Sequence, residues 1–274
     1  MARSESLTTS RPTPIAERGA YRDAAELVLV AIAFLLYFIV RANVIDRPDL
    51  ALENARQVVD LEKALGIYAE AAWQDAIIGH ELIVRFFNFV YFWLDFPLIA
   101  ALGLWMYFRR RPHYTFTRDA ILFSGALALI AYHLFPVAPP RLLPEAGLLD
   151  TLQLYNSASY QAQSTEFFVN PYAALPSLHV GWAVLVALGV TLAMPGNRFV
   201  LSLALAHVVA QSTSTVFTGN HYFLDWAGGL VAAVGGVTFA VFMQRHGYEL
   251  LRRRLGIGRD EDDDQRFESR ETVR

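Results

Sequence analysis

The chain has no cysteine among its 274 residues, which excludes disulfide frameworks, thiolate metal sites and cysteine nucleophiles. Charge is also scarce, because charged residues make up only 18% of the chain and its middle is nearly uncharged. With a formal net charge of −3, we expect no nucleic-acid partner. What the chain has instead is apolar character: 54% of its residues are hydrophobic and its mean hydropathy is positive. This composition predicts that the bilayer is its solvent.

Six apolar segments are long enough to cross a membrane, since a helical crossing takes about 20 apolar residues at roughly 1.5 Å per residue. The first segment lacks the small-residue cleavage pattern of a secretory signal peptide and continues through bulky residues, so we expect a retained anchor. The expected crossings are residues 24–40, 82–108, 120–135, 176–194, 199–217 and 222–243.

Between the first two crossings, apolar residues recur at helical spacing among charged ones, which is typical of an amphipathic helix on a membrane or protein surface. The sequence thus predicts an all-α fold, an integral membrane six-helix bundle with an additional amphipathic interfacial helix. We expect this domain at residues 21–246, a disordered tail at 1–20, and a basic then acidic cytoplasmic tail at 247–274. The apolar positions of the amphipathic helix are Leu52, Ala55, Val58, Leu61 and Leu65.

The basic residues predict the orientation, because Lys and Arg accumulate on the cytoplasmic side of a membrane. With the N-terminus inside, the inner loops and tails hold most of them, and the short loop at 109–118 alone holds four arginines. We therefore expect a multi-pass protein of the plasma (inner) membrane with both termini in the cytoplasm. The segment 136–171 and the turn before the sixth crossing then face outward.

Two histidines are expected to meet on that outer face. His179 opens the fourth crossing and His221 opens the sixth, and the fifth crossing returns the chain to the same side. We expect each histidine in the first turn of its helix, where free backbone N–H groups and the helix dipole favour an anion. Ser177 adds a donor, and Arg141, the only basic residue of 136–171, suits bidentate binding of phosphate oxygens. The expected ligand is a phosphate group.

His221 and Asp225 are spaced i, i+4, so on a helix they share one face. The carboxylate then fixes one tautomer of the imidazole and stabilises its charged form, as in other nucleophile-and-orienter pairs. A histidine that attacks phosphorus needs a second group to protonate the departing oxygen, and His179 is the candidate. Water or another alcohol would then attack the phosphohistidine, and no cofactor is needed.

At this point the residues resemble a known family. ALPSLH at 174–179 and GNHYFLD at 219–225 resemble the second and third signature motifs of the type 2 phosphatidic acid phosphatase superfamily, and FPVAPPR at 135–141 resembles a reduced first motif. Leu178 stands where lipid phosphatases usually carry Gly. With this Leu the second motif resembles that of the inositol phosphorylceramide synthase branch, whose members transfer a phosphoinositol head group between lipids. The resemblance covers roughly 82–243. It implies a helical bundle with His221 as nucleophile, Asp225 as its partner, His179 as acid, and Arg141 and Ser177 as phosphate ligands.

Two positions depart from that pattern. Leu134 stands where the superfamily's first motif has a Lys, and Thr215 stands where its third motif has an Arg. A site with fewer positive charges suits a phosphodiester better than a doubly charged monoester, and His133 is a candidate to replace some of the lost charge.

Three further residues are candidate substrate ligands. Asp95 lies within the second crossing, where ionisable groups are costly and mark function. Substrate contact and structural pairing, with Arg85 as a partner, both stay open for it. Asn220 and Tyr222 flank His221 in the third motif.

The functional hypothesis is a metal-independent membrane enzyme that cleaves a phosphorylated lipid or transfers its head group, and the acceptor stays open. An alternative is a non-catalytic transporter or lipid-binding protein whose polar residues line a pathway. A zinc site is the other alternative, because His179, His221 and Asp225 are legitimate ligands. They lack a fourth strong ligand, and their place beside Arg141 favours an anion.

Overall fold

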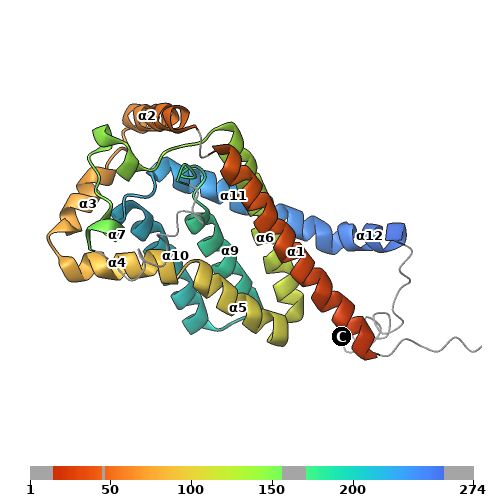
Figure 1. Ribbon diagram of the computed structural model, residues 1–274. Coiled ribbons are helices and arrows are strands. Elements are labelled where there is room, and N and C mark those ends of the chain that lie inside the picture. The colour runs from red at the N-terminus through yellow and green to blue at the C-terminus, as the bar shows by residue number, and fades with distance from the viewer. Residues whose placement is uncertain (1–14, 45–46, 156–170, 256–274) are drawn as a thin grey trace, which may run out of the picture.

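The computed structural model describes residues 15–44, 47–155 and 171–255. Within these ranges the regular structure is helical, apart from an isolated bridge between Val137 and Ala173 (Figure 1). This confirms the all-helical prediction. The longer elements are α1 (Ile15–Val44), α2 (Pro48–Leu65), α3 (Glu70–Ile78), α4 (Glu81–Trp93), α5 (Phe96–Arg109), α6 (Arg111–Leu134), α9 (Leu178–Ala193), α10 (Arg198–Phe217) and α11 (Phe223–Phe242). The shorter ones are η1 (Pro140–Leu142), η2 (Pro144–Ala146), α7 (Thr151–Leu154), η3 (Met243–Gly247) and α12 (Tyr248–Leu255).

Helix α9 occupies the centre of the bundle and packs on α6, α10 and α11 (Figure 1). Small residues let the backbones approach closely, as in other membrane helix pairs. A Cβ added to Gly181 of α9 would lie 2.7 Å from the carbonyl oxygen of Gly229 on α11. A Cβ added to Gly229 would clash with the carbonyl oxygen of Ser177. This crossing brings the N-terminal ends of α9 and α11 together.

The membrane-crossing helices agree in part with the expectation. In the described part of the chain, α1, α10 and the continuous α11–α12 stretch are long and apolar enough to span a bilayer. Helices α4 and α5 qualify together as a fourth span bent by 46°. Helix α9 is apolar but has only 16 residues, and α6 carries Arg111, Arg118 and Asp119 near its start. The chain is therefore a multi-pass membrane protein with three or four candidate spans by length and composition, and all six expected crossings coincide with helices.

Several element ends differ from the expectation. Helix α1 begins at Ile15, within the segment expected to be a disordered tail, and residues 1–14 lie outside the described residues. At the other end α11 continues through η3 into α12, and residues 256–274 lie outside the described residues. The crossing expected at 82–108 is broken after Trp93, because Pro97 in the first turn of α5 lacks an N–H donor and disfavours helical geometry before it.

Helix α2 forms where the amphipathic pattern predicted a helix. Pro48 at its start and the left-handed Gly66 (φ 70°) after its end fit standard helix boundaries. Its buried face differs from the expected stripe, because Leu61 and Leu65 are exposed and a charged residue, Glu62, is fully buried. The reason for this burial lies at the start of α11, which α2 contacts (Figure 1).

Candidate active site

The two histidines from successive motifs are in direct contact. His221 Nε2 lies 3.4 Å from His179 Nδ1, and the two rings meet edge to face with their centroids 5.4 Å apart. His179 is in the first turn of α9, as expected. His221 differs from the expectation, because α11 begins at Phe223 and His221 lies in the turn just before it. The convergence therefore comes from the turn between α10 and α11 as well as from the helices.

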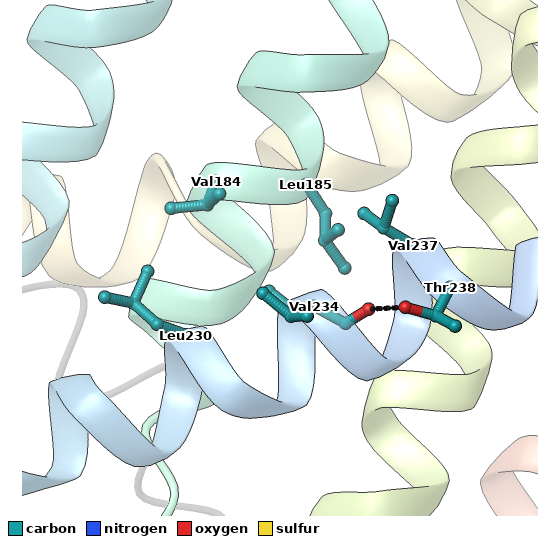
Figure 2. A pocket seen from close by; sticks show the side chains of 7 residues that line it. Val184, Leu185, Leu230, Val234, Val237 and Thr238 are labelled. Carbon is teal, nitrogen blue, oxygen red and sulfur yellow. Dashed lines mark hydrogen bonds between the residues drawn. The ribbon is translucent and has the colours of Figure 1, made fainter.

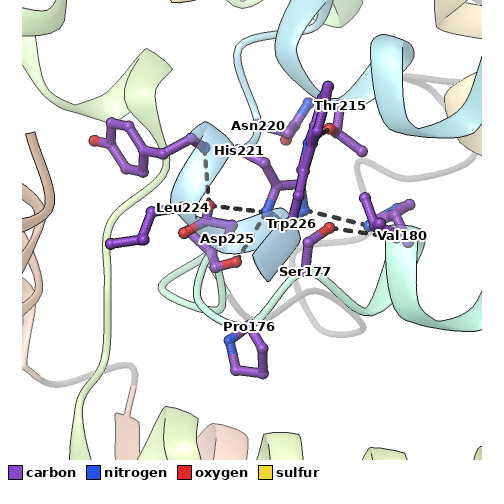
Figure 3. A network of polar contacts seen from close by, with 12 residues as sticks. Pro176, Ser177, Val180, Thr215, Asn220, His221, Leu224, Asp225 and Trp226 are labelled. Atoms are coloured by element: carbon purple, nitrogen blue, oxygen red, sulfur yellow. Dashed lines mark hydrogen bonds and ion pairs between the residues drawn. The ribbon is translucent and has the colours of Figure 1, made fainter. Parts of the chain in front are cut away.

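The His221 ring is oriented by two acceptors on the same nitrogen. Its Nδ1 lies 2.8 Å from the carbonyl oxygen of Ala174. The same nitrogen lies 3.1 Å from Oδ2 of Asp225 (Figure 3). Both atoms only accept, so Nδ1 carries the proton and Nε2 presents its lone pair to His179. Burial lowers the pKa of His221 to about 3, and the charge of Arg141 acts in the same direction. The imidazole is therefore neutral near pH 7, and its Nε2 lone pair is available.

Asp225 links this ring to the backbone of both helices. Its Oδ2 also accepts the N–H of Tyr222 at 2.9 Å, while its backbone oxygen accepts the N–H of Ser177 at 2.9 Å. The side chain is fully buried, and its Oδ1 has no hydrogen-bond partner among the described residues. Because one carboxylate oxygen holds both the ring and the first turn of α11, the orientation of His221 follows that of the helix.

The N-terminus of α11 is not open to a substrate anion, and the expectation that it would bind phosphate is wrong. Glu70 Oε1 accepts the N–H of Phe223 at 2.9 Å, and Glu62 Oε1 accepts the N–H of Leu224 at 2.6 Å. With Asp225 on the N–H of Tyr222, three carboxylates of the protein itself occupy this turn. The free N–H groups of a helix N-terminus bind hydrogen-bond acceptors, and here carboxyl oxygens from α2 and α3 already occupy two of them. The N-terminus of α9 is likewise capped, since Ser177 Oγ accepts the N–H of Val180 at 3.4 Å.

Glu62 and Glu70 are the residues that the sequence did not reveal. Both side chains are fully buried, although the sequence predicted that the helix carrying Glu62 lies on a surface and predicted no element at Glu70. Burial raises the pKa of Glu62 well above its ordinary value, and the neighbouring Glu70 raises it further. Their hydrogen-bond partners lie 162 and 153 positions away along the chain, so no local pattern marks the contact.

Arg141 reaches the site from η1, the short helical turn that follows α6. Its Nε lies 3.1 Å from Oδ2 of Asp150, and its Nη1 donates to Oδ1 of Asn220. Its backbone N–H donates to the carbonyl of Gly219 at 2.9 Å. Gly219 has φ 72°, and a Cβ there would lie 2.7 Å from the carbonyl of Leu149. Arg141 and Asn220 are thus joined beside the histidines, but Asp150 offsets the guanidinium charge.

Asp95 contacts the second histidine. It sits between α4 and α5, and its Oδ2 lies 3.5 Å from Nε2 of His179. Arg85, considered as its structural partner, instead pairs with Glu81 at 2.7 Å. Tyr91 stacks on the His179 ring, with centroids 4.2 Å apart and an interplanar angle of 20°. Asp95 thus lies beside His179 and not beside Arg85, and its contact with substrate stays a prediction.

The remaining candidates lie apart from the histidine pair. Tyr222 is fully buried in an apolar cluster with Ala55 and Val58 of α2, and its hydroxyl has no hydrogen-bond partner among the described residues. His133 is exposed at the end of α6, where its backbone oxygen accepts from Arg47 at 2.7 Å. Among the described residues, no hydrogen bond joins the His133 ring to the site.

The two positions that depart from the superfamily pattern have other roles here. Leu134 is 71% exposed at the end of α6 and contributes nothing polar. Thr215 is fully buried, and its carbonyl accepts the N–H groups of Asn220 and His221 at 2.9 and 3.1 Å. Its hydroxyl accepts from the Trp226 indole at 2.9 Å (Figure 3). Thr215 therefore shapes the turn that presents His221, and Arg141 is the site's cation in the described part of the chain.

An apolar pocket lies away from the histidines, between α9 and α11 (Figure 2). Its walls hold no titratable group, so it offers no acid–base or nucleophilic chemistry. The lining residues of the pocket are Val184, Leu185, Leu230, Ala233, Val234, Val237 and Thr238.

The described residues contain no group of three or more His, Cys, Asp or Glu side chains placed to hold a metal ion.

Comparison with known proteins identifies a family and a distant relative. The family described as the PAP2 superfamily matches residues 56–239, which is more than half of the chain. The chain is also similar to the inositol phosphorylceramide synthase catalytic subunit aur1 of Schizosaccharomyces pombe, with 36% identity over 69 residues. That match covers 25% of this chain and 16% of the relative, so it is distant and partial. No solved structure matches.

Proposed function

Because the chain belongs to the PAP2 superfamily, whose members are phosphatases and phosphotransferases, we propose that it is a membrane enzyme that transfers a phosphorylated group from a lipid through a phosphohistidine on His221. The observation that carries this proposal is the 3.4 Å contact between His221 Nε2 and His179 Nδ1, with the opposite nitrogen of His221 held by Asp225 and Ala174. Nucleophilic displacement at phosphorus requires a lone pair that attacks and a proton for the leaving oxygen. His221 Nε2 supplies the lone pair, and His179 Nδ1 supplies the proton.

The reaction proceeds in two halves. A substrate phosphate enters at the contact between the rings, and the lone pair of His221 Nε2 attacks phosphorus as the bond to the leaving oxygen breaks. His179 Nδ1 gives its proton to that oxygen, so the product alcohol leaves neutral. In the second half, His179 Nδ1 takes a proton from water or an acceptor hydroxyl, whose oxygen attacks phosphorus as the P–N bond breaks. Asp225 stabilises the positive charge that His221 carries between the two halves.

Substrate recognition is assigned to Arg141, Asn220 and Ser177. Arg141 is a single guanidinium, and its pairing with Asp150 leaves little net positive charge for the phosphate. A singly charged phosphodiester suits such a site better than a doubly charged monoester. This supports transfer of a phospho-head group between lipids over release of inorganic phosphate from phosphatidic acid or an isoprenyl phosphate. The aur1 relative, named as the catalytic subunit of an inositol phosphorylceramide synthase, is in line with this choice.

We also propose that the chain makes six crossings in the plasma (inner) membrane, with both termini in the cytoplasm and the histidines at the external face. The membrane domain would span 21–246, with tails on either side. Support comes from the short α9 and the bent α4–α5 pair, which lie within the bundle between longer apolar helices. Accessibility labelling of single cysteines introduced at Glu145 and Arg198 tests this, since only the first should react from outside.

The test of the activity uses purified protein and a panel of labelled lipid mono- and diesters, scored for both free phosphate and new phospholipid products. His221→Ala is compared with His80→Ala, whose histidine is exposed and away from the site. We expect turnover to vanish in the first variant and to persist in the second. Equal turnover in both variants would instead favour the transporter or lipid-binding alternative.

A further inference from the structure

The catalytic histidines form part of a longer line of four side chains. From one end to the other, Asp225 lies 3.1 Å from His221, His221 lies 3.4 Å from His179, and His179 lies 3.5 Å from Asp95. Each histidine thus has a carboxylate on the nitrogen that faces away from its partner. Asp225 belongs to the same motif as His221, whereas Asp95 comes from a separate helix pair and matches no motif in the sequence.

The break between α4 and α5 is held in place around Asp95. His207 Nε2 of α10 lies 2.7 Å from the carbonyl of Leu94, and Gln211 Nε2 donates to the carbonyl of Tyr91 at 3.2 Å. Tyr91 in turn stacks on the His179 ring. The Asp95 side chain is 13% exposed and that of His179 is 23% exposed. The carboxylate therefore faces the histidine from a fixed, largely dry position.

The contact between His179 and Asp95 depends on which ring nitrogens carry protons. His221 Nδ1 bears a proton toward Ala174 and Asp225, so His221 Nε2 accepts, and His179 Nδ1 must be the donor between the two rings. If Nδ1 held the only proton of His179, its Nε2 lone pair would face the Asp95 carboxylate, which is repulsive. The contact is favourable only if a further proton lies between Nε2 and Asp95. With a proton between Nε2 and Asp95, His179 can also keep the proton on Nδ1, and Nδ1 is then a hydrogen-bond donor.

We propose that Asp95 is the positioning residue of the general acid: it holds His179 with its Nε2 proton toward the carboxylate and its Nδ1 proton toward the leaving oxygen. This inference rests on the proposed function. When the P–O bond breaks, the leaving oxygen takes the Nδ1 proton, and His179 becomes neutral with its remaining proton on Nε2. Nδ1 then has a lone pair and takes the proton of the acceptor hydroxyl as the P–N bond breaks, which restores the starting state.

The leaving group distinguishes this role from a structural one. An alkoxide leaving group needs a proton, whereas nitrophenolate leaves without one, so two diesters of the same lipid phosphate are compared, one with an alkyl and one with a nitrophenyl leaving group. For Asp95→Asn we expect the single-turnover rate of leaving-group release, which reports the first half of the reaction alone, to fall on the order of 100-fold with the alkyl ester but less than about threefold with the nitrophenyl ester. The ratio of the two rates does not depend on how much of the protein is folded.

Three control variants test this interpretation. His179→Ala should show the same selective loss with the alkyl ester, and the double variant Asp95→Asn/His179→Ala should lose no more than His179→Ala alone. Glu145→Gln changes an exposed carboxylate and should behave like the wild type. If Asp95→Asn yields no folded protein, Asp95→Ser is measured in the same way. Equal losses on both esters, or no loss on either, would overturn the assignment. Failure of the proposed function is separate, since His221→Ala would then retain turnover of both esters.

Discussion

Replacing Asp225 by Asn is the substitution whose outcome the structure specifies in most detail. Asp225 Oδ2 accepts from the His221 ring and from the N–H of Tyr222, whereas Oδ1 is buried without a partner. An amide whose oxygen takes the place of Oδ2 keeps both hydrogen bonds. Its nitrogen then stands where Oδ1 stood, and a buried donor without a partner costs about 1–3 kcal/mol of the free energy of unfolding.

The expected loss of activity in Asp225→Asn depends on the contacts that still hold the His221 ring. In the Ser-His-Asp triad an Asn in place of the Asp lowers kcat about 10⁴-fold, chiefly because the wrong histidine tautomer results. Here the carbonyl of Ala174, 2.8 Å from Nδ1 of His221, holds the tautomer independently. The variant should lose only the stabilisation of positive charge on the ring. A hydrogen bond to a charged group contributes about 1.5–3 kcal/mol, so kcat should fall roughly ten- to hundredfold.

The assay is turnover of a labelled lipid diester in detergent, normalised to folded protein by thermal unfolding of the same preparation. His221→Ala sets the floor of the measurement. A loss as large as that of His221→Ala would refute the reasoning, because it would mean that Ala174 does not hold the ring. Wild-type kcat would also refute it, because Asp225 would then have no part in charge stabilisation.

Three other outcomes are expected. Glu62→Gln keeps an acceptor for the N–H of Leu224 and should stay close to wild type in thermal unfolding, whereas Glu62→Ala should lose about 1–3 kcal/mol by orphaning that donor, so equal damage by both would contradict the capping role. Asp150→Asn removes the carboxylate beside Arg141 and should raise the monoester-to-diester rate ratio roughly tenfold, the effect of a unit charge about 10 Å away at an effective dielectric near 20, and an unchanged ratio would count against charge-based selection. Because burial depresses the pKa of His221 from 6.5 to about 3, the unfolded state binds a proton that the folded state refuses, so stability should fall as pH drops from 6.5 toward 3, and His221→Gln should flatten that part of the unfolding profile.

The parts that the sequence predicted depend on local pattern. The apolar segments coincide with helices, and the return of the chain through α10 brings His179 and His221 into contact across 42 positions. The i, i+4 spacing of His221 and Asp225 corresponds to a 3.1 Å contact, although a turn, not a continuous helix, presents the histidine. Periodicity and span counting are enough for these features, because they need only helix geometry and alternation of membrane sides.

The parts that the sequence did not predict depend on long-range contacts between charged and backbone groups. Glu62 appeared to belong to the polar face of a surface helix, yet it caps α11 from within the core. That capping removed the anion site expected at the same helix end. The sequence also did not predict the partner of Asp95. The helix break before Pro97 places the carboxylate beside His179, whereas Arg85 pairs with Glu81. Neither partner can be found from spacing alone.

The central claim is that the phosphorylated group is transferred through His221. Its most direct test is to mix the purified protein with a lipid phosphate labelled at phosphorus, to quench within a single turnover under alkaline conditions that preserve phosphohistidine, and to locate the label by mass spectrometry of the peptides. We predict acid-labile label on His221 in the wild type, and none in His221→Ala. Product formation in the wild type with no label on His221 at any quench time would contradict the account.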